Sequence, residues 1–289
     1  MEIVYIFNGL GNQMSQYAFA LRKKSLGHNV GCVFKDTAHN GIELGQLFGI
    51  DTHNPRFVAF FNFLYGLNLT IHHHTLKSII LFILRLCGVK SYVERLNYAF
   101  QPELLIKNRS VGLYIGGWHH YKYFNDIGDE IKALYKFPVF KKAENQEIAG
   151  AAQADNAVAI HIRRGDFMDK TNYHVFGCVC SETYYQKALT MIEGMVQSPV
   201  YYVFSNDMEW AKGLLSGRNA VYVDWNTGND SWADMALMSK FKNIIIPNST
   251  FSWWAAWLGR SDKYVLCPPV FVYDDPSSDV FLPEWIRVE

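Results

Sequence analysis

The second half of the chain alternates short apolar runs with longer segments in which apolar side chains recur at helical spacing. The apolar runs have the length of buried strands and cover 157–162, 199–204, 220–223, 244–246 and 264–266. The longer segments are predicted helices and cover 181–196, 208–215, 232–241 and 250–258. Strands that alternate with helices of this length form βαβ units, so this half predicts a parallel, doubly wound sheet.

The first half begins with the same alternation, loses it, and then resumes it. The predicted strands and helices of this half cover 3–7, 13–26, 30–34, 111–115 and 124–135. Between about 38 and 110 the chain has no clear periodicity. This long interruption leaves the centre of the first half without predicted elements.

The two halves are expected to be separate domains, because 289 residues is long enough for about two of them. We place the first at 1–155 and the second at 156–289, since the polar, Ala-rich segment 141–154 lies between the two patterns as a helix or a linker. The predicted fold class is α/β, with two Rossmann-like domains that face one another. Such domains bind a ligand in the cleft between them, at the carboxyl ends of their strands.

The composition is that of a folded protein and excludes two classes. Hydrophobic residues make up 49% of the chain and charged residues 19%, which argues against wholesale disorder. Lysine and arginine together number 27, as do aspartate and glutamate, so the net charge is zero. Nucleic-acid binders normally carry a clear basic excess, so no nucleic-acid partner is expected.

The cysteines and the first residues of the chain indicate the cellular compartment in which the protein works. The five cysteines are an odd number, and the close pair Cys178 and Cys180 has the wrong spacing for a zinc knuckle. Reduced thiols and no structural metal site are therefore expected. Residues 2–7 read as a strand and lack the basic and apolar regions of a signal peptide, which favours a cytoplasmic protein.

One apolar segment, at 76–89, raises the question of membrane contact. Its unbroken apolar run, at 79–84, is far shorter than the ~20 residues that a spanning helix needs. A buried helix is favoured over a helix that lies on a bilayer. The three histidines at 72–74 are interpreted as surface residues, because consecutive side chains point in different directions and rarely bind one ion together.

Three groups of polar residues follow predicted strands, where open α/β sheets bind ligands. The first group, Asn8–Gln13, is a turn that contains Gly9 and Gly11 and leads into a helix. Such a turn lets backbone N–H groups approach an anion or a sugar. It lacks the third glycine of the dinucleotide fingerprint and the Lys-Ser/Thr pair of a P-loop. A tight turn without any ligand explains this group equally well.

The second group, His161–Phe167, ends a strand with a histidine, two arginines and an aspartate. The planar guanidinium group binds phosphate oxygens in a bidentate manner, so one arginine is expected to hold a diphosphate. The other is expected to pair with Asp166 and hold the loop. A structural ion-pair cluster is the alternative, but four such groups at one strand end favour the phosphate site.

The third group, Pro247–Trp254, begins a helix with small hydroxyl residues. Their hydroxyls and the first N–H groups of the helix would bind phosphate oxygens, and simple N-capping is the alternative. Asp207 also follows a strand, where it could accept hydrogen bonds from a base or a ribose. Asp234 is either a partner of a helix dipole or a ligand contact.

These groups carry a resemblance to a known family. In order along the chain, Gly9–Gln13, His161–Asp166 and Asn248–Trp254 resemble the motifs of the α-1,2-fucosyltransferases of glycosyltransferase family 11. Gly117–Phe124 and Val203–Asp207 are also similar to segments of that family. The resemblance runs from residue 3 to about residue 270, and its most specific part is the His-x-Arg-Arg-Gly-Asp element. No motif matches in the aperiodic stretch of the first half, which leaves the acceptor open.

The resemblance implies a GT-B-like fold and inverting transfer of L-fucose from GDP-L-fucose to the 2-hydroxyl of a galactose-type acceptor. It implies no catalytic metal and no cofactor, GDP-L-fucose being the co-substrate. It further suggests a bacterial enzyme of surface-polysaccharide assembly that works in the cytoplasm. A lipid-linked acceptor would bring such an enzyme into peripheral contact with the inner face of the membrane.

The resemblance also assigns roles to individual residues. Arg163 is similar to the arginine that contacts the donor β-phosphate, and Asn12 to a residue that faces the sugar and the acceptor, so both are the expected catalytic residues. His161 and Asp207 would lie near the guanine and the ribose. The expected donor-binding residues are Gly9, Gly11, Asn12, His161, Arg163, Arg164, Asp166, Asp207, Ser249, Thr250, Phe251 and Ser252.

The chemistry agrees with this interpretation. Fucose transfer passes through an oxocarbenium-like transition state while negative charge grows on the departing β-phosphate. Without a metal, fixed cations and helix-end N–H groups must stabilise that charge. No carboxylate is marked by its spacing as the general base, and Asp36 and Glu43 are no more than candidates.

Four other functions compete with this one. A transferase that uses another nucleotide sugar and a related protein O-fucosyltransferase belong to the same broad class. A Rossmann oxidoreductase is disfavoured by the incomplete glycine fingerprint and by arginines where an acidic residue would bind the ribose of NAD. A carbohydrate-binding module is the non-enzymatic option, because eight tryptophans could stack on sugars, although most follow helical spacing.

Overall fold

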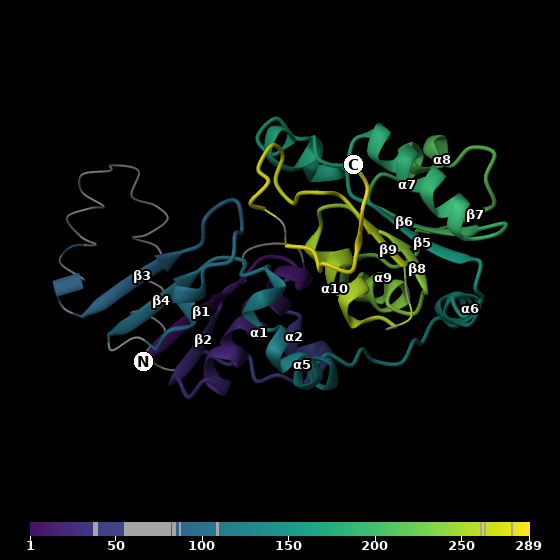
Figure 1. Ribbon diagram of the computed structural model, residues 1–289. Helices are drawn as coiled ribbons and strands as arrows, with labels where there is room; N and C mark the ends of the chain where they lie inside the picture. Colours follow the sequence, from purple (N-terminus) through teal and green to yellow (C-terminus); the bar gives the residue numbers. More distant parts are fainter. Residues whose placement is uncertain are drawn as a thin grey trace. The chain divides into compact units, whose positions relative to one another are not determined.

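The structure is a computed structural model that describes two compact units of the chain. The described residues are 1–36, 40–54, 82, 85–86, 88–107, 110–260, 262, 264–278 and 280–289. The units are Met1–Leu134 and Tyr135–Glu289 (Figure 1). The histidines at 72–74 and, apart from Phe82, the apolar run at 79–84 lie outside the described residues. None of the helices in the described ranges has the length and apolar character needed to cross a membrane.

The first unit contains a parallel four-stranded sheet in the order β2-β1-β4-β3. Its strands are β1 (Glu2–Ile6), β2 (Val30–Phe34), β3 (Val89–Val93) and β4 (Val111–Ile115). Every residue of β1 is buried, as expected for an apolar strand inside a parallel sheet. The edge strand β3 is partly exposed along its length and has no continuous apolar run. The sequence therefore did not predict it.

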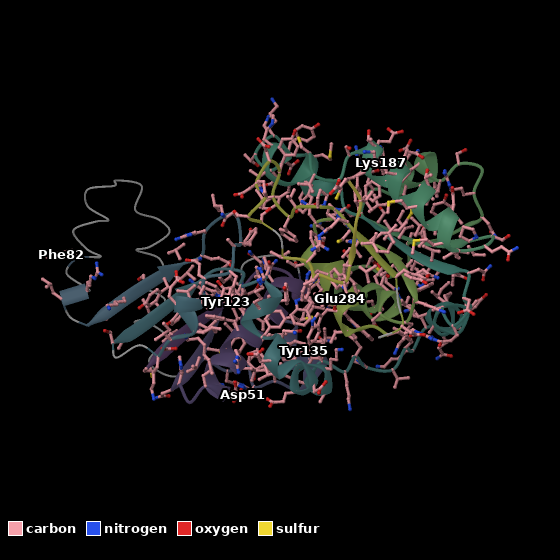
Figure 2. All side chains as sticks on the ribbon, viewed as in Figure 1. Asp51, Phe82, Tyr123, Tyr135, Lys187 and Glu284 are labelled. Atoms are coloured by element: carbon pink, nitrogen blue, oxygen red, sulfur yellow. The ribbon has the colours of Figure 1, made fainter. Side chains whose placement is uncertain are left out.

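Helices of the first unit pack an aromatic layer against its sheet. Among the described residues, this unit includes the helices α1 (Leu10–Ser25), α2 (Leu44–Phe48) and α5 (Gly128–Leu134), with 3-10 turns at Pro102–Leu105, Tyr121–Tyr123 and Asn125–Ile127. Phe19 of α1 stacks on Trp118 with ring centroids 4.7 Å apart, and both contact Tyr123 edge-on. Tyr123 lies among the packed side chains of this unit, whereas the exposed Asp51 lies at its outside (Figure 2). The layer fixes the loop after β4 against α1.

A buried group of charges joins the beginning of β1 to the end of α1. Lys23 Nζ and His28 Nδ1 each lie 3.0 Å from Glu2 Oε2, and the three side chains are almost completely enclosed. Lys23 also donates to the carbonyl oxygen of Leu104 and lies 4.3 Å from the ring centroid of Tyr114. Burial lowers the pKa of Lys23 against the opposing effect of Glu2. The Lys23 ammonium group is therefore held inside the protein by an ion pair, a hydrogen bond and an aromatic ring.

The second unit contains a parallel six-stranded sheet in the order β10-β9-β8-β5-β6-β7. Its strands are β5 (Ala157–Ile162), β6 (Val200–Ser205), β7 (Ala220–Val223), β8 (Asn243–Ile245), β9 (Tyr264–Cys267) and β10 (Ile286–Arg287). Helices α7 (Glu182–Met195) and α8 (Met208–Leu214) cover one face, and α9 (Trp232–Met238) and α10 (Thr250–Leu258) the other (Figure 1). The predicted parallel, doubly wound sheet is confirmed.

The helix α6 (Ala143–Ala151) belongs to the second unit. Asn145 of this helix exchanges hydrogen bonds with Asn226 and accepts one from Trp225 Nε1 at 2.8 Å. Lys142, just before α6, donates to the Trp225 carbonyl oxygen and pairs with Asp230 at 3.0 Å. The boundary placed at residue 155 from composition thus assigned α6 to the first domain, whereas its contacts tie it to the loop after β7.

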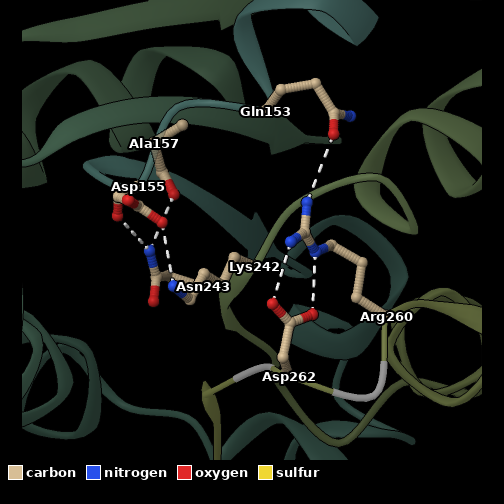
Figure 3. A network of polar contacts seen from close by, with 7 residues as sticks. All are labelled: Gln153, Asp155, Ala157, Lys242, Asn243, Arg260 and Asp262. Carbon is tan, nitrogen blue, oxygen red and sulfur yellow. Dashed lines mark hydrogen bonds and ion pairs between the residues drawn. The ribbon is translucent and has the colours of Figure 1, made fainter.

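The amino edge of the second sheet is held by polar contacts among its own residues (Figure 3). Lys242 pairs with Asp155 at 2.8 Å, and Asn243 Nδ2 donates to the carbonyl oxygens of Asp155 and Ala157. Arg260 binds both carboxylate oxygens of Asp262. These contacts join residues before and at the beginning of β5, β8 and β9, so they hold the amino ends of the strands together.

Candidate active site

The predicted polar groups of the second unit meet at the carboxyl edge of its sheet. β5 lies between β6 and β8, with Ile162 opposite Ser205 and Ile160 opposite Ile245. The residues that follow these three strands are therefore neighbours, although 42 residues separate Arg164 from Asn206. Expected donor-binding residues from three separate parts of the chain are brought together here.

The two arginines after β5 have different partners. Arg163 Nη2 lies 2.8 Å from Asp166 Oδ1, and the guanidinium group of Arg163 lies 5.6 Å from the Phe167 ring centroid. Arg164 Nε lies 3.1 Å from Asp207 Oδ2, and its guanidinium group lies 4.3 Å from the Trp210 ring centroid. Asp166 thus pairs with Arg163, the arginine that the resemblance assigns to the β-phosphate. Strand alternation turns Arg164 towards the residues after β6, where it pairs with Asp207. Which arginine binds phosphate stays a prediction.

The Asp207 carboxylate, which was predicted to accept hydrogen bonds from a base or a ribose, is bound by residues of the protein itself. Its Oδ1 accepts a hydrogen bond from the Trp210 backbone N–H at 3.2 Å, so it caps α8, and its Oδ2 pairs with Arg164. Asp207 thus orients Arg164 as well as the helix. Its predicted contact with a base or ribose stays a prediction.

Asn206 and Gly165 join the two loops, and sequence reasoning missed this role. Asn206 Oδ1 accepts from the backbone N–H of Arg164 at 2.8 Å. A Cβ atom on Gly165 would lie 2.3 Å from Asn206 Nδ2, so a larger residue here would displace the Asn206 side chain from its contact with Arg164. The glycine directly after two arginines was the available signal, because close approach of another group to the backbone is one reason for glycine at a loop.

His161 connects the end of β5 to the beginning of α10. Its Nδ1 and Ser252 Oγ are 2.8 Å apart, and its ring centroid lies 5.8 Å from that of Phe251. Burial, followed by the charge of Arg163, lowers the pKa of His161 to about 3. The imidazole is therefore neutral at physiological pH and acts here as a rigid hydrogen-bonding link.

The N-terminus of α10 carries groups that can interact with an anion. Ser249 occupies the N-cap position but its side chain makes no capping hydrogen bond, so capping does not use this hydroxyl. Asn248 is completely buried and donates to the carbonyl oxygens of Phe176 and Phe271, which holds the turn before the helix. The first N–H groups of a helix lack partners within the helix and favour negative charge. Thr250 and Phe251 begin this helix.

The edge therefore combines a cation with a helix N-terminus. The Arg163 side chain retains 26% exposure, and its pair with Asp166 is a half-exposed contact between residues three apart. Such pairs contribute little to stability, so the guanidinium group can exchange Asp166 for phosphate oxygens at low cost. This arrangement suits a diphosphate.

The first unit holds the remaining predicted residues, and they are described within that unit alone. α1 begins at Leu10, so Gly11 and Asn12 lie in its first turn and Gly9 is its N-cap with an extended backbone. The left-handed residue of the turn is Asn8, with φ +66°. Gln13 Nε2 donates to the carbonyl oxygens of Asn8 and Gly41. The predicted turn is thus a short, tied connection into the helix.

The structure also gives the surroundings of Asp234 and the arrangement of the residue types that bind metals. Asp234, in the first turn of α9, accepts a hydrogen bond from Asn226 at 2.8 Å, and burial raises its pKa to about 7. Within the described ranges, no group of three or more His, Cys, Asp or Glu side chains is arranged to hold a metal ion.

Comparisons with known proteins bear on this site. The family model described as glycosyl transferase family 11 matches residues 89–289. The chain is 27% identical to an α-1,2-colitosyltransferase of Escherichia coli over 99% of this chain and 98% of that protein. It is 24% identical to the human galactoside α-(1,2)-fucosyltransferase 1 over 57% of this chain, and this match spans about half of that protein (49%).

A solved structure shows the same fold. The NodZ α-1,6-fucosyltransferase soaked with GDP-fucose superposes with a TM-score of 0.50, covering 89% of this chain and 92% of that one at 13% identity. At this identity the likeness concerns the fold alone. The α/β, GT-B-like class is confirmed, and the donor cleft between the two domains stays a prediction.

Proposed function

Because the chain belongs to glycosyltransferase family 11, we propose that it is an inverting transferase that moves L-fucose from GDP-L-fucose to the 2-hydroxyl of a galactose-type residue in a surface glycan. The observation that carries this proposal is the meeting of Arg163 and the N-terminus of α10 at one sheet edge, joined by the contact between His161 and Ser252. That edge offers a diphosphate both a guanidinium fork and the first N–H groups of a helix.

The reaction needs this positive environment at one moment. As the bond from sugar C1 to the β-phosphate oxygen breaks, negative charge accumulates on GDP. Once the bound diphosphate has replaced Asp166 as the partner of Arg163, this guanidinium group and the first N–H groups of α10 are in place to stabilise that charge. Asp207 and Asn206 hold Arg164 and the loop beside Arg163, so the cation keeps its place. Asn12 in the first unit is proposed to face the sugar and acceptor.

A second donor is supported by one observation. The relative that matches along almost its whole length is named an α-1,2-colitosyltransferase. Colitose is L-fucose without its 3-hydroxyl, so the two GDP sugars present the same diphosphate to Arg163. A site built to hydrogen-bond that hydroxyl rejects the deoxy sugar strongly, by about 10⁴-fold or more, whereas an apolar contact discriminates weakly.

Incubation with GDP-L-fucose, GDP-L-colitose, GDP-mannose and UDP-galactose, each with a panel of galactosides, tests the donor and the linkage. We expect transfer from GDP-L-fucose to a galactose 2-hydroxyl, identified by linkage analysis of the product. Preferential use of GDP-L-colitose would select the second donor. Transfer from UDP-galactose alone, or binding of glycans without consumption of any donor, would contradict the proposal.

Metal independence gives a separate prediction. If the Arg163 guanidinium group and the α10 N-terminus neutralise the leaving diphosphate, extensive dialysis against EDTA should leave the rate of GDP release within about twofold of the untreated protein. A matched incubation with added Mg²⁺ and Mn²⁺ serves as the control. Loss of turnover with EDTA that either ion restores would show that a metal does this work.

A further inference from the structure

The carboxyl edge of the first sheet holds a buried carboxylate that the donor chemistry does not use. Glu94 follows β3 directly, and its backbone N–H donates to the Ile115 carbonyl oxygen at 3.0 Å, continuing the ladder with β4. The residue is only 8% exposed. Since all four strands are parallel, it lies at the same edge as the turn after β1 that leads to Asn12. Ligands of α/β sheets bind at this edge.

One carboxylate oxygen of Glu94 is held and the other is not. Oε2 accepts hydrogen bonds from the backbone N–H groups of Gly117 at 2.6 Å and Trp118 at 2.9 Å. Oε1 is enclosed and has no hydrogen-bond partner among the described residues. A buried polar atom without a partner is rare in native proteins and calls for an explanation, such as a catalytic role or a water. The two hydrogen bonds thus fix the orientation of the carboxylate, and Oε1 is left able to accept a proton.

The loop after β4 is shaped around this carboxylate at a cost in backbone strain. A Cβ atom on Gly116 would lie 2.4 Å from Glu94 Cβ, and one on Gly117 would lie 2.2 Å from His119 Nε2. Trp118 has a left-handed backbone with φ +54° and is completely buried. Left-handed conformations of such residues cost about 1–3 kcal/mol and persist where the surroundings impose them, often at functional sites.

A glutamine of α1 joins this loop to the residue after β1. Gln16 Nε2 donates to the Gly116 carbonyl oxygen at 2.9 Å, and Gln16 Oε1 accepts from the Phe7 backbone N–H at 2.8 Å. Asn12 lies one helical turn before Gln16 on the same helix. The loop that holds Glu94 and the helix turn that carries Asn12 are therefore parts of one rigid edge.

We propose that Glu94 is the general base of the transfer, which presupposes the function proposed above. The acceptor hydroxyl gives its proton, through one bridging water, to Glu94 Oε1 while its oxygen forms the bond to C1 of the fucosyl group. The bond between C1 and the β-phosphate oxygen breaks, and its electron pair leaves with GDP. Glu94 is then protonated and returns the proton to solvent after product release.

The protonation behaviour of the surroundings suits this role. Burial raises the pKa of Glu94 to about 7, against the two backbone hydrogen bonds that favour its charged form. A pKa near the working pH is the most effective for a general base. The titratable neighbours stay neutral there, since burial raises the pKa of Tyr98 to about 12, raises that of Tyr123 and lowers that of His119 to about 3. The base must be deprotonated, so activity should fall as the pH drops through about 7.

The test compares Glu94→Gln with the wild-type protein using GDP-L-fucose and a galactoside. Glutamine keeps an oxygen for the two N–H groups but accepts no proton, so kcat should fall about 10²–10⁴-fold while GDP affinity stays within twofold. The loss of activity at acidic pH seen in the wild type should disappear from the residual rate. Glu103→Gln, an exposed carboxylate of the same unit, serves as the matched control and should match the wild type.

The outcomes separate the two proposals. Absence of transfer by the wild type with every donor overturns the proposed function and with it the role of Glu94. Transfer by the wild type together with an unchanged rate and pH profile in Glu94→Gln overturns the role of Glu94 alone. The role of Glu94 is also overturned if Glu43→Gln, and not Glu94→Gln, removes the loss of activity at acidic pH. If Glu94→Gln fails to fold, Glu94→Asp provides the test. A shift in the pH at which activity falls on the acidic side supports Glu94 as the base, and an unchanged pH profile contradicts it.

Discussion

Replacing Arg163 by alanine is expected to reduce kcat for fucose transfer by about 10²–10³-fold, which corresponds to roughly 3 kcal/mol of transition-state stabilisation. The guanidinium group retains 26% side-chain exposure and has Asp166 as its exchangeable partner, so it can meet the charge that develops on the β-phosphate. Binding of GDP should weaken as well, because the product carries the same charge. Initial rates of GDP release and titration calorimetry with GDP measure the two effects.

The chain offers a matched control for this variant. Arg218 has the same 26% side-chain exposure and a similar ion pair, with Glu193 at 2.7 Å, but lies just before β7. Arg218→Ala should keep the wild-type rate, and Arg163→Lys should recover only part of it, since an ammonium group cannot bind two oxygens as a fork. Melting temperatures of all variants should agree closely, because half-exposed ion pairs contribute little to stability. A fully active Arg163→Ala would refute the role assigned to this arginine.

Replacing Lys23 by alanine is expected to lower the free energy of unfolding of the first unit by about 3–5 kcal/mol. The side chain is completely buried, and its removal leaves the Glu2 carboxylate enclosed without its cation and the Leu104 carbonyl oxygen without a donor. Hydrogen–deuterium exchange of amides in β1 and α1, together with urea denaturation, measures the change. The opening free energy of these amides should fall by a similar amount.

Two variants show whether the effect comes from the buried charge. Lys24→Ala changes the exposed neighbour on the same helix and should alter stability by less than about 0.5 kcal/mol. The double variant Glu2→Gln, Lys23→Met removes both charges and should recover much of the loss, because a buried pair replaced by neutral groups is often nearly neutral in stability. Equal destabilisation by Lys24→Ala and Lys23→Ala would contradict this account.

Much of the second unit follows from local pattern. The runs 157–162 and 220–223 coincide with β5 and β7, and the predicted helix 250–258 coincides with α10. Ser181 was a plausible cap from its residue type, and its hydroxyl accepts from the Tyr184 N–H at the beginning of α7. Because consecutive parallel strands end at one edge, the meeting of the groups after β5, β6 and β8 could also be predicted.

The first unit shows where local pattern stops. Glu94 lies in the aperiodic stretch, after an edge strand whose residues are neither continuously apolar nor clearly alternating, so nothing in the sequence marked it. Lys23 sits in the last turn of α1 among other basic residues, where a solvent-exposed side chain is the usual expectation. Its burial depends on Glu2, which is adjacent only because β1 and α1 pack together.

The sequence by itself determined most helices and strands of the second unit, the family motifs and the sheet edge at which the polar groups after β5, β6 and β8 gather, because periodicity and strand ends are properties of neighbouring residues. Only the tertiary structure decided which acid each arginine binds, that Asn206 and Gly165 connect two loops, and that α6 joins the second unit. It also decided that Glu94 is buried, with one carboxylate oxygen that has no partner in the described part of the chain. Those outcomes depend on distances between atoms far apart in the chain. Burial then sets the cost of each charge, and no local pattern encodes that cost.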